Sequence, residues 1–249
     1  MLKPISALLL AATLTSPVMA DDFSDKIKQA LKSEIRSEKE KARDRNRKPV
    51  QTLDFFGIQD DMKVLELIPG SGWYTKLLAP ALRDNGQLYL ALGTGRVEKL
   101  LENETALGKA KIVAKDSEFK YNETEKLYDL TSTDLKVRDL DAVLTFRNYH
   151  NLTEKTRTQL NESVFKALKP GGIYGVVDHT RRHMQDNDNE NGRRFDPVLA
   201  IKEIQAAGFE FVDYSKLHYR PDDELRYEVG RKSVTGNTDR FTFLFKKPE

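Results

Sequence analysis

Polar side chains follow two apolar runs of this sequence. One run ends in Phe146-Arg147-Asn148-Tyr149-His150-Asn151, and another ends in Asp178-His179-Thr180. A histidine titrates near neutral pH, a neighbouring carboxylate fixes its tautomer, and an arginine binds anions. This combination is typical of proton transfer on a bound small molecule. The predicted catalytic group comprises His150 or His179 as general base or substrate orienter, Asp178 fixing a tautomer, Arg147 binding an anionic group, and Tyr149.

Two alternatives exist for these residues. Asn148 and His150 also suit a helix cap that braces the surrounding loops. A metal site is the other alternative, because His150, Asp178, His179 and His183 could converge. No spacing requires a metal, since the segment between His179 and His183 is typical of a loop and does not hold both on one helix face. We therefore predict no metal ligands.

A second candidate site is the stretch ELIPGSGWYT, from Glu66 to Thr75. It follows an apolar strand and precedes a helix, and its glycines allow positive φ angles and a close approach to a ligand. Ile68 and Thr75 stand where the dinucleotide pattern G-x-G-x-x-G has glycines, so we do not expect a dinucleotide pyrophosphate on this loop. Glu66 is placed to accept hydrogen bonds from a ligand or to fix the loop. A tight strand-to-helix turn without a ligand is the alternative.

Strand-like and helix-like segments alternate from residue 50 almost to the C-terminus. This alternation predicts an α/β fold with a doubly wound, mainly parallel sheet and helices on both faces. The expected strands are Lys63–Ile68, Gln87–Leu92, Lys111–Ala114, Ala142–Phe146, Ile173–Val177 and Phe209–Tyr214. The expected helices are a short one around Val50–Phe56, then Trp73–Arg83, Arg96–Ala106, Glu154–Leu168 and Pro197–Ala207.

The last strand interrupts this alternation. The segment RFTFLFK, Arg240 to Lys246, follows no helix long enough for a parallel crossover, so it is expected to run antiparallel. In such a sheet, the carboxyl ends of neighbouring strands face one crevice, which brings both candidate sites together. The polar stretch Arg181–Arg194 predicts a mobile loop over that edge.

The N-terminal residues lie outside this domain. Lys3, an apolar run from Ile5 to Leu14, and the small-residue motif before Asp21 predict a signal peptide over residues 1–20, cleaved after Ala20. We therefore expect a periplasmic or secreted protein, with no stable membrane insertion after cleavage.

Residues 21–49 predict an amphipathic helical extension, and residues 50–249 predict the α/β domain. The basic end of that helix, residues 41–48, is interleaved with acids and suggests a solvated face.

Composition restricts the function classes. The chain has no cysteine, which excludes disulfides and thiolate chemistry, and its formal net charge of +2 is spread over mixed acids and bases. No nucleic-acid partner is therefore expected. A small-molecule substrate fits better, while the sequence does not specify an oligomeric state.

Taken together, these motifs resemble the class I S-adenosylmethionine-dependent methyltransferases, and more narrowly a group of secreted bacterial predicted methyltransferases. The resemblance is carried by ELIPGSGWYT, FRNYHN, Val177-Asp178-His179, Ala206-Ala207-Gly208-Phe209 and Thr238-Asp239-Arg240-Phe241. It implies a seven-stranded sheet and S-adenosylmethionine as cofactor. The implied cofactor-binding residues are Glu66, Gly70, Ser71, Gly72, Trp73, Tyr74, Asp116 and Asn148.

The sequence departs from that family twice. Ile68 replaces the usual first glycine, and the second strand ends Leu90-Ala91-Leu92-Gly93-Thr94 without the carboxylate that grips the ribose. The first hypothesis is methyl transfer to a small molecule in the cell envelope. The second is a non-catalytic ligand-binding or assembly protein on the same fold, and the third is an exported hydrolase that uses the same crevice.

Overall fold

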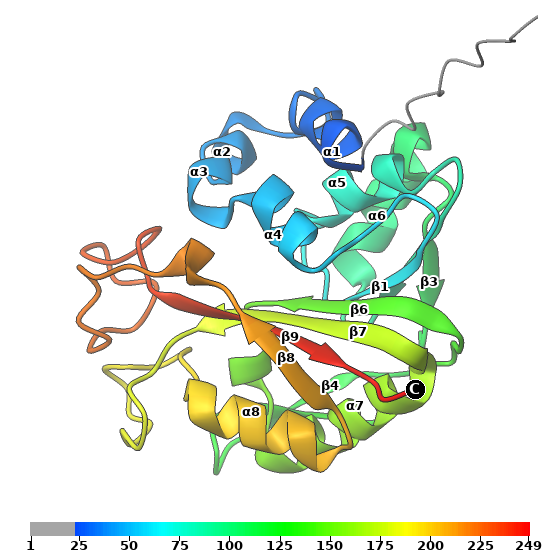
Figure 1. Cartoon of the computed structure of the whole chain (residues 1–249). Coiled ribbons are helices and arrows are strands. Elements are labelled where there is room, and N and C mark those ends of the chain that lie inside the picture. Colours follow the sequence, from blue (N-terminus) through cyan, green and yellow to red (C-terminus); the bar gives the residue numbers. More distant parts are fainter. Residues whose placement is uncertain (1–22) are drawn as a thin grey trace, which may run out of the picture.

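The computed structural model describes residues 23–249, so the predicted signal peptide and its cleavage site lie outside the described residues. A seven-stranded sheet with the order β3-β2-β1-β6-β7-β9-β8 forms the centre of the molecule (Figure 1). Strands β1, β2, β3, β6 and β7 run parallel, as predicted. The strands are β1 (Lys63–Leu67), β2 (Gln87–Ala91), β3 (Lys111–Val113), β6 (Leu140–Phe146), β7 (Leu168–His179), β8 (Glu210–Tyr214) and β9 (Arg240–Lys246).

Helices cover both faces of this sheet. Alternate residues of β1 divide between two apolar cores: Val64 packs on one face with Leu77 and Leu78, and Leu65 on the other with Leu160. This alternation follows from the period-two geometry of a strand. One face carries α1 (Phe23–Leu31), α4 (Pro49–Phe55), α5 (Thr75–Ala81) and α6 (Gly95–Asn103); the other carries α7 (Glu154–Ala167) and α8 (Pro197–Ala206).

The antiparallel last strand is confirmed. Strand β9 pairs antiparallel with both β7 and β8, and Phe241, Phe243 and Phe245 are buried in one core. The fold class is therefore the predicted one: a mainly parallel seven-stranded sheet with helices on both faces and an antiparallel last strand.

The N-terminal segment differs from the single helix that we predicted. It forms three helices, α1, α2 (Glu38–Lys41) and α3 (Asp44–Arg47). The break occurs where Arg36 turns inward, only 2% exposed, and donates to the Leu31 carbonyl and the Asp44 carboxylate. Ser37 and Glu40 then form a capping box that starts α2. The chain is thus folded back toward the sheet instead of extending into solvent.

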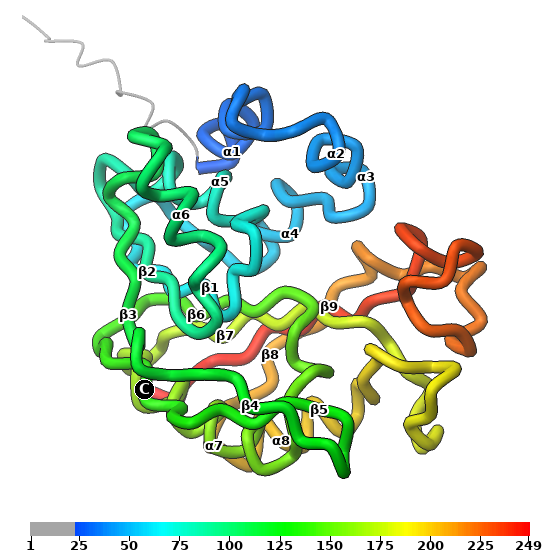
Figure 2. Tube along the Cα trace, turned by 180° about the vertical axis from the view of Figure 1, so that it is seen from behind, coloured from blue at the N-terminus to red at the C-terminus, as the bar shows by residue number. Residues whose placement is uncertain are grey.

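A two-stranded hairpin is the main element that we did not predict. Strands β4 (Phe119–Asn122) and β5 (Leu127–Leu130) pair antiparallel between β3 and β6 in the sequence. Seen from behind, the hairpin lies on the side of α7 and α8 (Figure 2). Each strand has four residues and an exposed tyrosine, Tyr121 or Tyr128, so neither gives a clear alternating pattern.

Within residues 23–249, no helix is long and apolar enough to cross a membrane.

Candidate functional site

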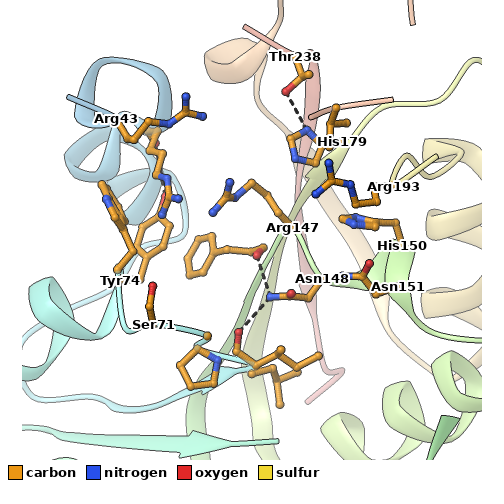
Figure 3. Close-up of a pocket in the computed structure, with 18 of the residues that line it drawn as sticks. Arg43, Ser71, Tyr74, Arg147, Asn148, His150, Asn151, His179, Arg193 and Thr238 are labelled. Carbon is orange, nitrogen blue, oxygen red and sulfur yellow. Dashed lines mark hydrogen bonds between the residues drawn. The ribbon is translucent and has the colours of Figure 1, made fainter. Parts of the chain in front are cut away.

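A cleft of about 530 Å³ opens at the carboxyl ends of β1, β6 and β7. The glycine loop after β1 and the polar ends of β6 and β7 meet there (Figure 3). The N-terminal helices and the segment before β9 complete its walls. Its polar and aromatic lining includes Arg43, Arg47, Glu66, Ser71, Trp73, Tyr74, Arg96, Arg147, Asn148, His150, Asn151, His179, Arg193, Thr235 and Thr238.

His150 and Asp178 form a buried pair at this cleft. The fully buried Asp178 carboxylate lies 2.6 Å from His150 Nδ1 and accepts from the backbone N–H of His150 at 3.0 Å and of His179 at 2.6 Å. Because the carboxylate accepts, Nδ1 carries the ring proton. Nε2 is therefore the free acceptor, and it has no partner among residues 23–249. This arrangement is that of an oriented general base.

His179 lies beside this pair. Its ring centroid is 5.9 Å from that of His150, and its Nδ1 is 2.9 Å from the Thr238 hydroxyl. Burial, followed by the neighbouring His150 and Arg240, holds the pKa of His179 well below its usual value. His179 is therefore neutral at physiological pH and bonded to Thr238, which suits a positioning role.

The glycine loop reaches the cleft through Gly70 and Ser71. Ile68, Gly70 and Gly72 all have positive φ, of 51°, 59° and 78°. A Cβ on Gly70 would meet nothing within 4 Å, so its backbone faces open space. A Cβ on Gly72 would lie 2.9 Å from Leu100 of α6. Gly72 therefore packs the loop against α6 and is not among the residues that line the cleft, so its position does not support the predicted ligand contact.

Asn148 joins the two candidate sites. Its side-chain amide donates to the carbonyls of Ile68 and Phe146, both at 3.0 Å (Figure 3). These bonds hold the left-handed turn at Ile68 against the end of β6. Asn148 thus shapes the glycine loop and also lines the cleft.

Glu66 fixes the loop from below. It is 3% exposed and accepts a 2.6 Å hydrogen bond from the Thr75 hydroxyl. Burial raises the pKa of Glu66 to about 7, although Thr75 and Arg47 act in the opposite direction. Of the two roles that the sequence allowed, the loop-fixing one is present in this structure.

Trp73 and Tyr74 form the aromatic wall. The Trp73 ring lies 4.2 Å from the Arg47 guanidinium carbon, and its Nε1 donates to the Glu40 carbonyl at 3.1 Å. Tyr74 stacks on Phe146 with centroids 3.6 Å apart, and burial raises the pKa of Tyr74 to about 12. The wall is therefore rigid, and the Tyr74 hydroxyl stays protonated.

The structure places Tyr149 outside the cleft. Its hydroxyl donates to Glu203 and accepts from Asn161, both at 2.8 Å, and its ring packs edge-on against Phe195. The turn after β6 points Tyr149 toward α7 and α8, where its contacts suit a packing role. Its position does not support the prediction that Tyr149 is catalytic.

Asp116 is likewise outside the cleft. It is exposed in the turn after β3, among residues that do not line the cavity. Its predicted contact with a cofactor is therefore not supported by its position. Its exposed position is that of an ordinary surface residue in a turn.

Arg43 and Arg47 also line the cleft, although we did not predict them as site residues. We expected a solvated helix face there because acids are interleaved with the basic residues. In the structure these acids are engaged elsewhere: Glu40 with Lys76, Asp44 with Arg36, and Glu38 with Lys41. The four-residue spacing of Arg43 and Arg47 was the available signal, because it places both on one helix face.

The predicted loop Arg181–Arg194 is irregular but anchored. Arg194 is 2% exposed and forms two 2.9 Å bonds with the buried Asp223 carboxylate. Asn191 is also buried, at 1% exposed. Neighbouring Arg193, which lines the cleft, is ion-paired with Glu228. The segment is therefore anchored at its C-terminal end, next to the one residue of it that lines the cleft, Arg193.

The cleft fits S-adenosylmethionine over part of its length. Open space at Gly70, the free N–H groups of a glycine loop and the aromatic wall suit the amino-acid half of such a ligand. The end of β2 offers no carboxylate for a ribose. Phe119 of the hairpin also covers Gly93, where a Cβ would lie 2.7 Å from the Phe119 ring.

Among residues 23–249, no group of three or more His, Cys, Asp or Glu side chains is arranged to hold a metal ion.

Comparison with known proteins establishes the fold. No protein-family model matches this sequence, and no curated protein matches it. A SAM-dependent methyltransferase from Aquifex aeolicus is similar over 90% of this chain and 97% of its own, with a TM-score of 0.57 and 15% identity. A SAM-dependent methyltransferase from Methanosarcina mazei covers 79% of this chain and 96% of its own, with a TM-score of 0.53 and 16% identity.

The cyclase SpnF is similar to the same degree. It covers 82% of this chain and 80% of its own, with a TM-score of 0.54 and 15% identity. At such identities the similarity shows a methyltransferase-like fold, and the fold by itself does not assign a reaction.

Proposed function

We propose that this protein is an S-adenosylmethionine-dependent methyltransferase that acts on a small molecule in the cell envelope. The observation that carries the proposal is the His150–Asp178 pair, whose free Nε2 belongs to the same cleft as Gly70 and Ser71. An oriented base beside an open glycine loop is what methyl transfer to a hydroxyl or amine requires.

The roles of the residues follow from the geometry. When bound, the cofactor supplies a methyl group for in-line displacement. Gly70 and Ser71 would hold its amino-acid half, with Trp73 and Tyr74 as the adjoining wall. His150 Nε2 accepts the proton of the attacking group, and the Asp178 carboxylate stabilises the resulting imidazolium. Neutral His179, bonded to Thr238, limits the space beside that base.

The proposed location rests on the N-terminal sequence. Residues 1–20 have the charge, apolar run and small residues of a cleaved signal peptide, which favours a periplasmic or secreted protein. The acceptor would then be a small molecule of that compartment.

A second candidate function is non-catalytic binding of a small ligand. The end of β2 favours it, because that end lacks a carboxylate and Phe119 covers Gly93. Loss of a charge-assisted contact weakens binding by about 1.5–3 kcal/mol. The two functions therefore differ in cofactor binding, which can be measured directly.

The test is calorimetric titration of the purified protein with S-adenosylmethionine and S-adenosylhomocysteine. Micromolar binding is expected for the unmodified protein, and Gly70→Arg should abolish it by filling the cleft. Gly57→Arg is the matched control, since Gly57 also has positive φ and open surroundings but lies outside the cleft. Absence of binding at millimolar ligand, or equal loss in both variants, would contradict the methyltransferase proposal.

A further inference from the structure

Four arginines gather around Tyr74 at one end of the cleft. Arg43 and Arg47 come from the N-terminal helices, and Arg147 follows β6; all three line the cavity. Arg240 lies at the start of β9 and is 3% exposed. Figure 3 shows Arg43 and Tyr74 on one side of the cleft, His150 and His179 on the other, and Arg147 between them.

These four guanidinium groups have no counter-ion in residues 23–249. None of them forms an ion pair or a side-chain hydrogen bond, and the buried Nε atoms of Arg47 and Arg240 have no acceptor. Three other arginines nearby are ion-paired: Arg36 with Asp44, Arg193 with Glu228 and Arg194 with Asp223. The cluster therefore differs from these paired arginines in having no carboxylate partner.

The carboxylates nearest the cluster are bonded to other groups. Asp178 acts on Arg147 at a distance, but its oxygens accept from His150 and from the backbone N–H of His179. Glu40 is paired with Lys76. Glu66 is bonded to Thr75, and its pKa of about 7 keeps much of it uncharged at neutral pH. Tyr74, with a pKa of about 12, carries no charge either.

The cluster is electrostatically unfavourable without a ligand. Burial first, and repulsion by Arg147 second, lowers the pKa of Arg47 to about 9 and that of Arg240 to about 10. Burial also lowers the pKa of Arg147, with Arg43 acting in the same direction. An anion among these groups would remove the repulsion and supply the missing acceptors.

We propose that Arg43, Arg47 and Arg147 bind a phosphate or diphosphate group of the small-molecule substrate, with Arg240 adding positive charge beside them. A single carboxylate carries one negative charge and would leave this cluster largely uncompensated, whereas a phosphoryl group offers more charge and several acceptor oxygens. That the phosphorylated molecule is the methyl acceptor rests on the proposed function. The anion site itself does not depend on it.

The two ends of the cleft would then have different roles in substrate binding and in the reaction. The phosphoryl group is held near Tyr74, and the remainder of the molecule extends past Arg147 toward His150 Nε2 (Figure 3). The arginines select and orient the substrate, while the histidine acts on it. No arginine of the cluster needs to take part in proton transfer.

The probe for the test is inorganic pyrophosphate, titrated calorimetrically into the purified protein with citrate as the comparison anion. Pyrophosphate is expected to bind at least tenfold more tightly than citrate. Arg147→Gln and Arg43→Gln should each weaken pyrophosphate binding by about 10- to 100-fold. Arg45→Gln is the control, because Arg45 is exposed on the same helix as Arg47 and lies outside the cleft.

A second measurement uses the stability of the ligand-free protein. Arg47→Gln should raise the melting temperature while weakening pyrophosphate binding, because it removes repulsion together with an anion contact. Lack of pyrophosphate binding, equal binding of citrate, or equal effects of Arg45→Gln and Arg147→Gln would overturn the proposal. Titration with S-adenosylhomocysteine is scored separately, so failure of the cofactor assignment and failure of the anion site give different results.

Discussion

Glu66 allows a sharp test of how the glycine loop is held. Its side chain is buried, and its only hydrogen-bond partner among residues 23–249 is the Thr75 hydroxyl. Replacement by glutamine keeps the shape and an acceptor for Thr75 but removes the ionisable proton. The comparison of Glu66→Gln with the unmodified protein therefore isolates the cost of charging this position.

The magnitude follows from the two pKa values. An unfolded glutamate titrates near 4.5 and folded Glu66 near 7, so between these values the folded state holds one more proton than the unfolded state. Stability therefore falls as the pH rises through this window, by about 1.4 kcal/mol per pH unit. The total loss of unfolding free energy is about 3 kcal/mol. None of it is lost below a pH of about 4.5, and all of it is lost above a pH of about 7.

The assay is urea unfolding at several pH values between about 5 and 8, followed by fluorescence of the single tryptophan, Trp73. The stability of Glu66→Gln relative to the unmodified protein should increase by about 2–3 kcal/mol over this range, while Glu102→Gln, at an exposed position, should show no such trend. A constant difference between Glu66→Gln and the unmodified protein would mean that Glu66 is ionised in the fold, and the reasoning would be refuted.

Three further predictions concern other parts of the molecule. His218 is 1% exposed, and burial lowers its pKa to about 4. The folded state therefore loses stability as the pH falls from about 6.5 to about 4. In His218→Asn this acid-induced loss of unfolding free energy should be smaller by about 3 kcal/mol, as followed by circular dichroism. Arg194→Met leaves buried Asp223 without its ion-pair partner and should cost about 3–5 kcal/mol in urea unfolding, whereas Arg193→Met should cost about 1 kcal/mol or less; similar losses would contradict the anchoring role. His150→Ala should lower methyl transfer, once an acceptor is known, by about 10²–10⁴-fold with cofactor affinity retained, and unchanged turnover would exclude His150 as the base.

The sheet could be predicted from sequence because its signals are local. Apolar runs such as Ala142–Phe146 and the alternating segment RFTFLFK each specify a strand by composition and period. The absence of a crossover helix before Arg240 fixed the antiparallel direction of β9. The joint position of the glycine loop and the β6 and β7 ends then followed from the general geometry of parallel sheets.

The remaining features depend on contacts between distant residues. Arg36 ends the first helix by reaching Asp44, and no local pattern distinguishes it from the arginines that stay in solvent. Tyr149 turns away from the cleft because its hydroxyl donates to Glu203 and accepts from the Asn161 amide. The arginine cluster could not be predicted for the same reason. Acidic residues lie close to Arg43 and Arg47 in the sequence, and only the fold shows that these acids pair with other basic residues.

The walls of the cleft come from nearly opposite ends of the described chain. Arg43 packs so closely on Gly236 that a Cβ there would lie 2.5 Å from its Nη1, and Thr235 and Thr238 complete the same wall. Contacts of such long sequence separation carry a high loop-closure entropy and form late in folding. A chain that ends before residue 235 would lack this wall, so a folding intermediate or a truncated product has no complete binding site. Only the completely folded chain therefore binds the ligand. Because the ligand binds the folded state and not the unfolded state, it would stabilise the whole chain against unfolding.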